Sequence, residues 1–90
     1  MRTLSLQELD DALKTLDGWK FDDGELVREF EFPGFVDAIA FVQTVAGLAE
    51  AANHHPDIDI RYNKVRLALV THDAGGITQK DVDLAREITG

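Results

Sequence analysis

Cysteine is missing from this 90-residue chain, and that absence removes several kinds of chemistry. Without cysteine there is no disulfide, no thiolate-bound zinc, no iron–sulfur cluster and no thiol nucleophile. Basic residues are also scarce: nine Lys and Arg stand against seventeen Asp and Glu, a formal net charge of −8 at pH 7. We therefore expect neither nucleic-acid backbones nor anionic membranes to be direct partners.

Long apolar stretches are absent as well. No uninterrupted apolar run approaches eighteen residues, so the sequence predicts no transmembrane helix. The N-terminal segment is amphipathic and acidic, which differs from the basic stub and apolar block of a signal peptide. A chain of this length without a linker or an internal repeat predicts one domain, residues 1–90, and we expect it to be cytoplasmic.

What the sequence does contain is a regular succession of helical and strand patterns. The capping-box pattern Ser5-x-x-Glu8 precedes leucines at helical spacing and predicts a first helix. A central helix is predicted at about residues 35–52, and Thr78 is predicted to cap a last one. Alternating side chains predict strands at residues 19–21, 26–32, 57–62 and 64–72, with Asn63 at a positive-φ turn position.

The arrangement of these strands predicts the fold class. Strands that occur in hairpins, instead of alternating singly with helices, favour an antiparallel sheet. The order α-β-β-α-β-β-α therefore predicts an α+β fold in two layers, with a four-stranded antiparallel sheet and three helices on one face. The strand at residues 64–72 is apolar on both sides, which predicts a place inside the sheet or at an interface.

The predicted central helix carries two apolar stripes. One stripe consists of Phe41, Val45, Leu48 and Ala52. The other consists of Phe35, Ala38, Ile39, Val42, Ala46 and Ala49. Two such faces exceed what one side of a sheet covers. A fully buried helix would explain them, but in so small a domain we expect the first stripe to lie in the subunit interface of a homodimer or homotetramer.

All three histidines of the chain fall in one region. His54 and His55 follow the central helix, and His72 ends the second predicted hairpin. Because a hairpin reverses direction, its two ends meet, and we expect the three imidazoles to converge. Imidazole titrates near neutrality, so such a pocket could donate one proton and accept another at the same pH. The alternative is that His54 and His55 only cap the helix C-terminus.

Carboxylates near the histidines could orient them. Glu50 lies one helical turn before His54, and Asp73 and Asp81 flank the far side. The alternatives are a solvated helix face for Glu50 and a helix cap for Asp81. Three histidines can also bind zinc, but His54 and His55 are adjacent and lack the i, i+4 spacing of a helical zinc site, so we expect no metal.

The residues around the histidines are similar to the pterin-4a-carbinolamine dehydratase family. The family pattern is Glu-x3-His-His-Pro, an aromatic residue in the following strand, a third His, and an Asp nine residues later. The chain matches this pattern at Glu50, His54-His55-Pro56, Tyr62, His72 and Asp81. The similarity also covers the region of Trp19, the Phe-rich strand that ends at Phe32 and the helix that begins at Phe35.

The resemblance implies the same α+β fold and a reaction. The reaction is dehydration of 4a-hydroxytetrahydrobiopterin to quinonoid dihydropterin and water, which recycles the cofactor of aromatic amino-acid hydroxylases without metal or organic cofactor. His54, His55 and His72 would be the catalytic residues: His54 and His72 as acid and base, His55 binding and orienting the pterin. The pterin pocket would be lined by Asn53, His54, His55, Val70, Thr71, His72 and Asp73.

Two positions depart from the common family pattern. Asn53 stands where many members have Asp, so an uncharged amide that can still hydrogen-bond replaces a carboxylate there, and Ala74 stands where many have Cys. Trp19 is expected in the core, with stacking on a flat ligand as the alternative. Two other functions stay open: a dimerisation cofactor for a homeodomain transcription factor, acting through the oligomer-forming helix, and a pterin-related role in molybdopterin metabolism.

Overall fold

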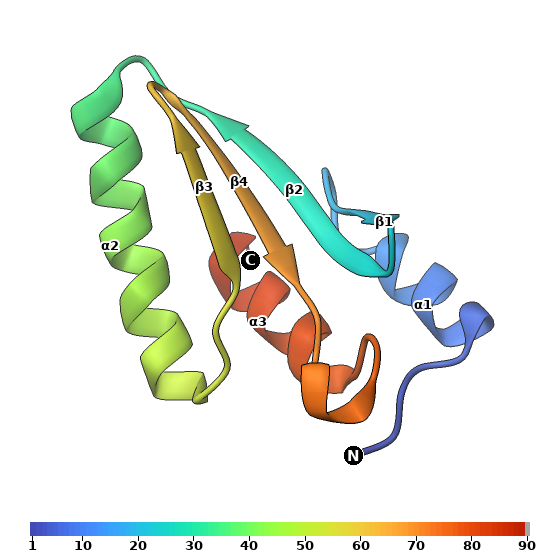
Figure 1. Ribbon diagram of the computed structural model, residues 1–90. Helices are drawn as coiled ribbons and strands as arrows, with labels where there is room; N and C mark the ends of the chain where they lie inside the picture. The colour runs from blue at the N-terminus through green and yellow to red at the C-terminus, as the bar shows by residue number, and fades with distance from the viewer. Residues whose placement is uncertain (90) are drawn as a thin grey trace.

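The computed structural model describes residues 1–89 as a four-stranded antiparallel sheet and three α-helices (Figure 1). The strands follow the order β1-β2-β4-β3 across the sheet. The predicted α+β class and the order α-β-β-α-β-β-α are confirmed. The elements are α1 Leu6–Leu13, β1 Lys20–Asp22, β2 Glu25–Glu31, α2 Phe35–Ala52, β3 Asp57–Arg61, β4 Lys64–Leu69, the short 3-10 helix η1 His72–Ala74, and α3 Gln79–Thr89.

Helix α1 begins at the predicted capping box. The Ser5 hydroxyl accepts a hydrogen bond from the Glu8 backbone N–H at 3.1 Å, and the Glu8 carboxylate accepts one from the Ser5 backbone N–H at 2.8 Å. Arg2 donates to both carboxylate oxygens of Glu8, and these bonds lower the pKa of Glu8 to about 2. The N-terminal segment is thereby tied to the first turn of α1.

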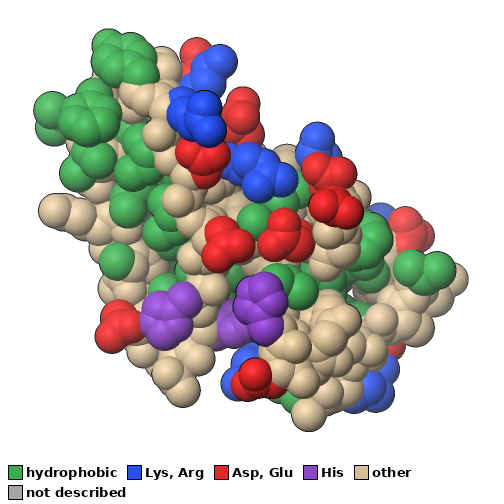
Figure 2. Space-filling model, viewed as in Figure 1, with side chains coloured by type: hydrophobic (Ala, Val, Ile, Leu, Met, Phe, Trp, Pro, Cys, Tyr) green, Lys and Arg blue, Asp and Glu red, His purple; other side chains and the backbone are tan. Residues whose placement is uncertain are grey.

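Strand β4 lies inside the sheet, between β2 and β3. Val65, Leu67 and Leu69 of β4 are fully buried on the face that packs on the helices. Ala68 points to the opposite face, where it pairs with Val27 of β2, and both are buried. The two apolar sides of β4 therefore match the internal position that the sequence predicted. Figure 2 shows acidic and basic side chains interspersed over the outer face of the sheet.

The turn between β3 and β4 differs from the prediction. Tyr62, not Asn63, has the positive φ, at +54°. The Asn63 side-chain amide donates to the Phe32 carbonyl at 2.8 Å, and the Asn63 carbonyl accepts from the Phe32 backbone N–H at 2.9 Å. Asn63 is thus held against the end of β2, and the left-handed conformation occurs at the exposed Tyr62 instead.

Helix α2 packs on the sheet with a face that belongs to neither predicted stripe alone. Its buried residues are Ala38, Val45 and Ala49. Phe41 packs on Phe30, at 4.6 Å between ring centroids, and Leu48 also packs against the core. The stripe predicted for a subunit interface is therefore core: Val45 is 0% exposed, and only Ala52 of that stripe is exposed. The uncovered side of α2 consists of other residues.

The length of α2 bears on the membrane prediction. Its eighteen residues are long and apolar enough to cross a membrane by length and composition alone, although the sequence predicted no such helix. Core helices of soluble proteins meet the same two criteria. Ala38, Val45 and Ala49 pack α2 against the sheet, but only 17% of the helix is buried, so much of its surface is uncovered.

Candidate active site

The three histidines gather where α2 ends and η1 begins, on one side of the molecule (Figure 2). Asn53 ends α2 in the left-handed conformation, with φ +51° and ψ 42°, and its backbone N–H bonds to carbonyls of the last helical turn. Asn tolerates this conformation better than most residues with a side chain. Asn53 therefore reverses the chain so that His54 and His55 leave α2 in different directions.

His54 turns inward against α3. Its side chain is 11% exposed, and its Nε2 lies 2.5 Å from Oδ1 of Asp81, which is 0% exposed. Oδ2 of Asp81 accepts hydrogen bonds from the Thr71 hydroxyl and from the Thr78 backbone N–H, each at 2.8 Å. Asp81 therefore both orients a histidine and caps a helix. One of its oxygens contacts His54, and the other accepts a hydrogen bond from the backbone N–H at the start of α3.

His55 turns outward. Its Nε2 lies 2.5 Å from Oε2 of Glu50, and the two side chains are 57% and 78% exposed. The sequence had placed Glu50 beside His54, one helical turn later. The left-handed Asn53 explains the difference, because it turns His54 away from the axis of α2 and leaves His55 within reach of Glu50.

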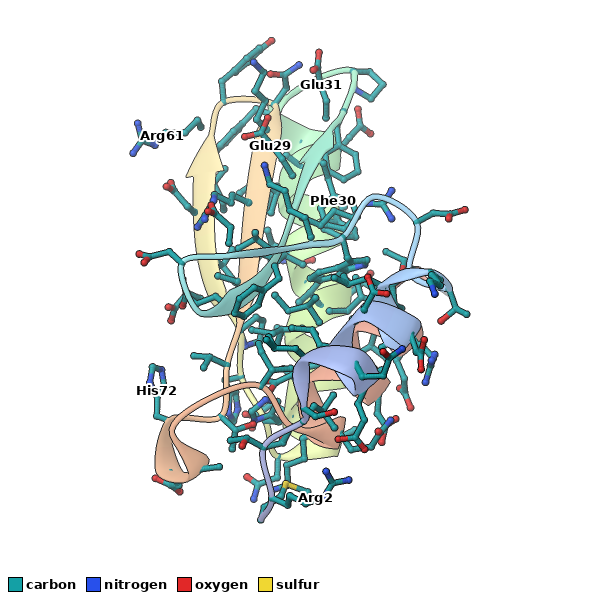
Figure 3. The ribbon with its side chains drawn as sticks, turned by 90° about the vertical axis from the view of Figure 1, so that its right-hand side faces the viewer. Arg2, Glu29, Phe30, Glu31, Arg61 and His72 are labelled. Carbon is teal, nitrogen blue, oxygen red and sulfur yellow. The ribbon has the colours of Figure 1, made fainter. Side chains whose placement is uncertain are left out.

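His72 lies on a loop, not on a strand. The sequence predicted β4 as far as His72, but β4 ends at Leu69 and His72 is the first residue of η1. The carbonyl of Thr71 accepts from the backbone N–H groups of Ala74, Gly75 and Gly76, which closes this loop tightly. Figure 3 shows His72 projecting from the loop. It is exposed, and within residues 1–89 no side-chain hydrogen bond to its ring is found.

These groups surround an open pocket of about 340 Å³. Its lining includes all seven residues that the family resemblance implied, and one more, Lys80. No sequence signal marked Lys80, because a lone lysine in the first turn of an acidic helix normally faces solvent. The lining residues are Asn53, His54, His55, Val70, Thr71, His72, Asp73 and Lys80.

Trp19 and Glu50 do not line this pocket. Trp19 is 5% exposed, packs edge-on against Phe30 and donates its indole N–H to the Thr89 hydroxyl at 3.2 Å, so it belongs to the core. Within residues 1–89, no three His, Asp or Glu side chains are grouped to hold a metal ion. Nε2 of both His54 and His55 faces a carboxylate instead.

A larger depression, of about 630 Å³, lies between the ends of α1 and α3. Arg28 and Arg86 line it together with Asp17 and Glu87, so the charges of its lining balance. Arg28 already donates to the Asp17 carbonyl at 2.6 Å and lies 4.6 Å from the centre of the Phe30 ring. The larger depression has no histidine in its lining, and we therefore place the candidate chemistry in the smaller pocket.

Comparisons with known proteins show the family of the chain. The family model for pterin 4 alpha carbinolamine dehydratase matches residues 2–90. A protein of Mycobacterium avium, provisionally named pterin-4-alpha-carbinolamine dehydratase, is 54% identical over 90 residues, which cover 100% of this chain and 96% of that protein. A protein of Acidobacterium capsulatum with the same provisional name is 56% identical over 88 residues, covering 98% and 96%.

Solved structures give the same result for the fold. A transcriptional coactivator/pterin dehydratase from Brucella melitensis superposes with a TM-score of 0.94 at 36% identity, covering 98% of this chain and 96% of that one. A pterin dehydratase-like RuBisCO assembly factor of the alpha-carboxysome shares the fold, with a TM-score of 0.62 at 21% identity over 78% and 81% of the two chains. The chain belongs to the pterin-4a-carbinolamine dehydratase family.

Proposed function

We propose that this protein dehydrates 4a-hydroxytetrahydrobiopterin to quinonoid dihydropterin and water by histidine acid–base catalysis, within tetrahydrobiopterin recycling. The observation that supports this most strongly is the convergence of all three histidines of the chain on one pocket. Membership of the family supplies the substrate class, a pterin. A volume of about 340 Å³ is suited to one small molecule.

The reaction needs two proton transfers and no external oxidant. The C4a–O bond breaks as an acid protonates the leaving hydroxyl, and a base removes the proton from N5, whose electron pair forms the C4a=N5 bond. His54 enters the pocket from the segment that follows α2, and His72 enters it from η1, so one can act as the base and the other as the acid. Each transfer contributes about 10²–10⁴-fold in rate. This chemistry requires no metal and no organic cofactor.

The remaining lining residues are assigned to substrate binding. His55 is exposed and contacts the still more exposed Glu50, so it is suited to orienting the pterin. Asn53, Val70, Thr71 and Asp73 complete the binding set, partly through backbone groups. Asn53 carries no charge, and its left-handed backbone accounts for the residue found there.

The test is a dehydration assay with 4a-hydroxytetrahydrobiopterin generated in place by an aromatic amino-acid hydroxylase. The substrate also loses water spontaneously, so the rate must be compared with the rate without protein. We expect an acceleration that is proportional to protein concentration. If folded protein does not raise the rate above the spontaneous rate, the proposal is refuted. Enzymatic activity only on a molybdopterin-type substrate would place the pocket in molybdopterin metabolism instead.

We also propose that the protein is a cytoplasmic homodimer or homotetramer that associates through the uncovered side of α2. Val36 is 79% exposed, and Ala40, Gly47 and Ala51 lie on the same exposed helical stripe. Ala40→Glu should dissociate the oligomer without disturbing the core. Sedimentation velocity at micromolar concentration checks this, and a compact wild-type monomer would contradict it.

A binding role is the second candidate, because the Brucella melitensis neighbour is described as a transcriptional coactivator as well as a dehydratase. Such a role would use the exposed side of α2 and not the histidines. Ala40→Glu should then abolish binding to the dimerisation segment of a homeodomain transcription factor, while His54→Ala should retain it. Titration calorimetry with the two variants distinguishes the cases, and the reverse pattern would exclude this role.

A further inference from the structure

One pocket residue, Thr71, is bonded both to the carboxylate that faces His54 and within the loop that carries His72. The Thr71 hydroxyl donates to Oδ2 of Asp81 at 2.8 Å, and the other oxygen of Asp81 faces His54. The Thr71 backbone closes the loop that carries His72: its N–H donates to the Gly76 carbonyl at 3.0 Å. Thr71 therefore links Asp81, the carboxylate that faces His54, to the loop that carries His72.

The directions of the hydrogen bonds in this network follow from counting hydrogens. The single hydroxyl hydrogen of Thr71 is used on Asp81, so the 2.7 Å contact between Thr71 Oγ1 and Thr78 Oγ1 requires Thr78 to donate. Thr78 Oγ1 in turn accepts from the Lys80 backbone N–H at 3.3 Å. Protons thus point from Thr78 to Thr71 and on to Asp81, which reinforces each bond in the chain.

The same count sets the proton on His54. Asp81 is fully buried, and Oδ2 receives two donors, the Thr71 hydroxyl and the Thr78 N–H. With Asp81 taken as ionised, its oxygens only accept hydrogen bonds, so His54 donates to Oδ1 through Nε2–H. In neutral His54 the Nδ1 atom is then without a proton. Every buried side-chain nitrogen within residues 1–89 has a partner and none is found for Nδ1 of His54, so this atom reaches solvent.

We propose that Thr71 is a positioning residue of the reaction: its hydroxyl holds Asp81 so that His54 carries its proton on Nε2 and presents an unprotonated Nδ1 to the substrate. His54 is then the proton acceptor, and the exposed His72 is the donor. This inference rests on the proposed dehydratase function for its kinetic consequence. Its structural consequence, the state of the His54 ring, is independent of that function.

The experiment compares Thr71→Val, which removes the hydroxyl and keeps the backbone and size, with Thr71→Ser, which restores the hydroxyl. Thr15→Val is the matched control, because its hydroxyl bonds to the Ala12 carbonyl and Arg86, away from the pocket. Long-range ¹H–¹⁵N spectra identify which ring nitrogen of each histidine carries the proton. Steady-state kinetics give kcat and KM, and circular dichroism verifies folding.

We expect neutral wild-type His54 in the Nε2–H form. Thr71→Val should populate the Nδ1–H form and lower kcat about tenfold with little change in KM, the loss of one hydrogen bond to a charged group. Thr71→Ser should recover most of the kcat that Thr71→Val loses, and Thr15→Val should stay within about twofold of wild type in kcat. The ring signals of His72 should not change, because the Thr71 backbone remains in place.

Two results would overturn the inference: wild-type His54 found as the Nδ1–H form, or a folded Thr71→Val with wild-type kcat and an unchanged His54 ring. If Thr71→Val does not fold, Thr78→Val leaves the Thr71 hydroxyl in place and removes its donor, together with the acceptor of the Lys80 backbone N–H. It should lower kcat about twofold, with a smaller ring shift; unchanged values there would also overturn the inference. A wild-type protein without dehydratase activity would refute the proposed function, while the spectra would still decide the role of Thr71.

Discussion

Two neighbouring histidines make the same contact in two different environments. In both His54–Asp81 and His55–Glu50 the imidazole Nε2 lies 2.5 Å from a carboxylate oxygen. The first pair is buried, at 11% and 0% exposure, and the second is open to water, at 57% and 78%. Water screens the second pair, so the contact contributes little to stability. Asp81 is buried, so no water can replace its hydrogen-bond partners if one of them is removed. Burial, not distance, separates the two roles.

The largest effect is expected from removing the imidazoles on either side of the reacting bond. His54→Ala and His72→Ala should each lower kcat about 10²-fold or more, because each removes one proton transfer. The double variant should retain little beyond the spontaneous rate. Steady-state assays with circular dichroism check this prediction. Folded single variants with wild-type kcat would return the histidines to a capping role.

Asp81 should rank next, and it should affect both activity and folding. Asp81→Ala leaves His54, the Thr71 hydroxyl and the Thr78 N–H without their common acceptor. We expect a loss of about 3 kcal/mol in the free energy of unfolding and a lower kcat. Urea unfolding measures the first and the dehydration assay the second. An unfolding free energy equal to wild type would show that the buried network contributes nothing.

His55 should affect binding more than chemistry. Its side chain lines the pocket but is more than half exposed. His55→Ala should raise KM severalfold with kcat nearly unchanged, the signature of lost uniform binding. A kcat that falls as far as in His54→Ala would remove the distinction between the two histidines.

Glu50 should have the smallest effect. Glu50→Gln removes one charge of an exposed pair, and such pairs contribute between 0 and about 1 kcal/mol. We expect kcat within about twofold of wild type and an unfolding midpoint in urea close to that of wild type. A large loss of activity would mean that the exposed pair acts on the substrate.

The sequence predicted the positions of the histidines because their placement follows from topology. A helix end and the far end of a hairpin must meet in this fold, so His54 and His72 lie around one pocket whatever their rotamers are. The α+β class followed from the same hairpin pattern. The capping box at Ser5 and Glu8 was also predictable, because it depends on three consecutive peptide units and not on packing.

What the sequence did not predict depends on single backbone angles and on how α2 packs against the sheet. Glu50 contacts His55 and not the predicted His54, because the backbone of Asn53 is left-handed. The periodicity of the sequence does not reveal such a backbone angle. Tyr62 replaced Asn63 as the positive-φ residue because the Asn63 amide is bonded to Phe32. The core face of α2 runs between the two predicted stripes, since Val45 and Ala49 both face the sheet and each stripe supplies one of them.

A double-mutant cycle on kcat for the two histidine–carboxylate pairs tests most directly the claim that Asp81 acts through His54 while His55–Glu50 is a solvated contact. If Asp81 acts only through His54, the kcat of His54→Ala/Asp81→Asn should equal that of His54→Ala alone, and the cycle of His55→Ala with Glu50→Gln should show no coupling. Losses that multiply in the first pair, or strong coupling in the second, would contradict the account.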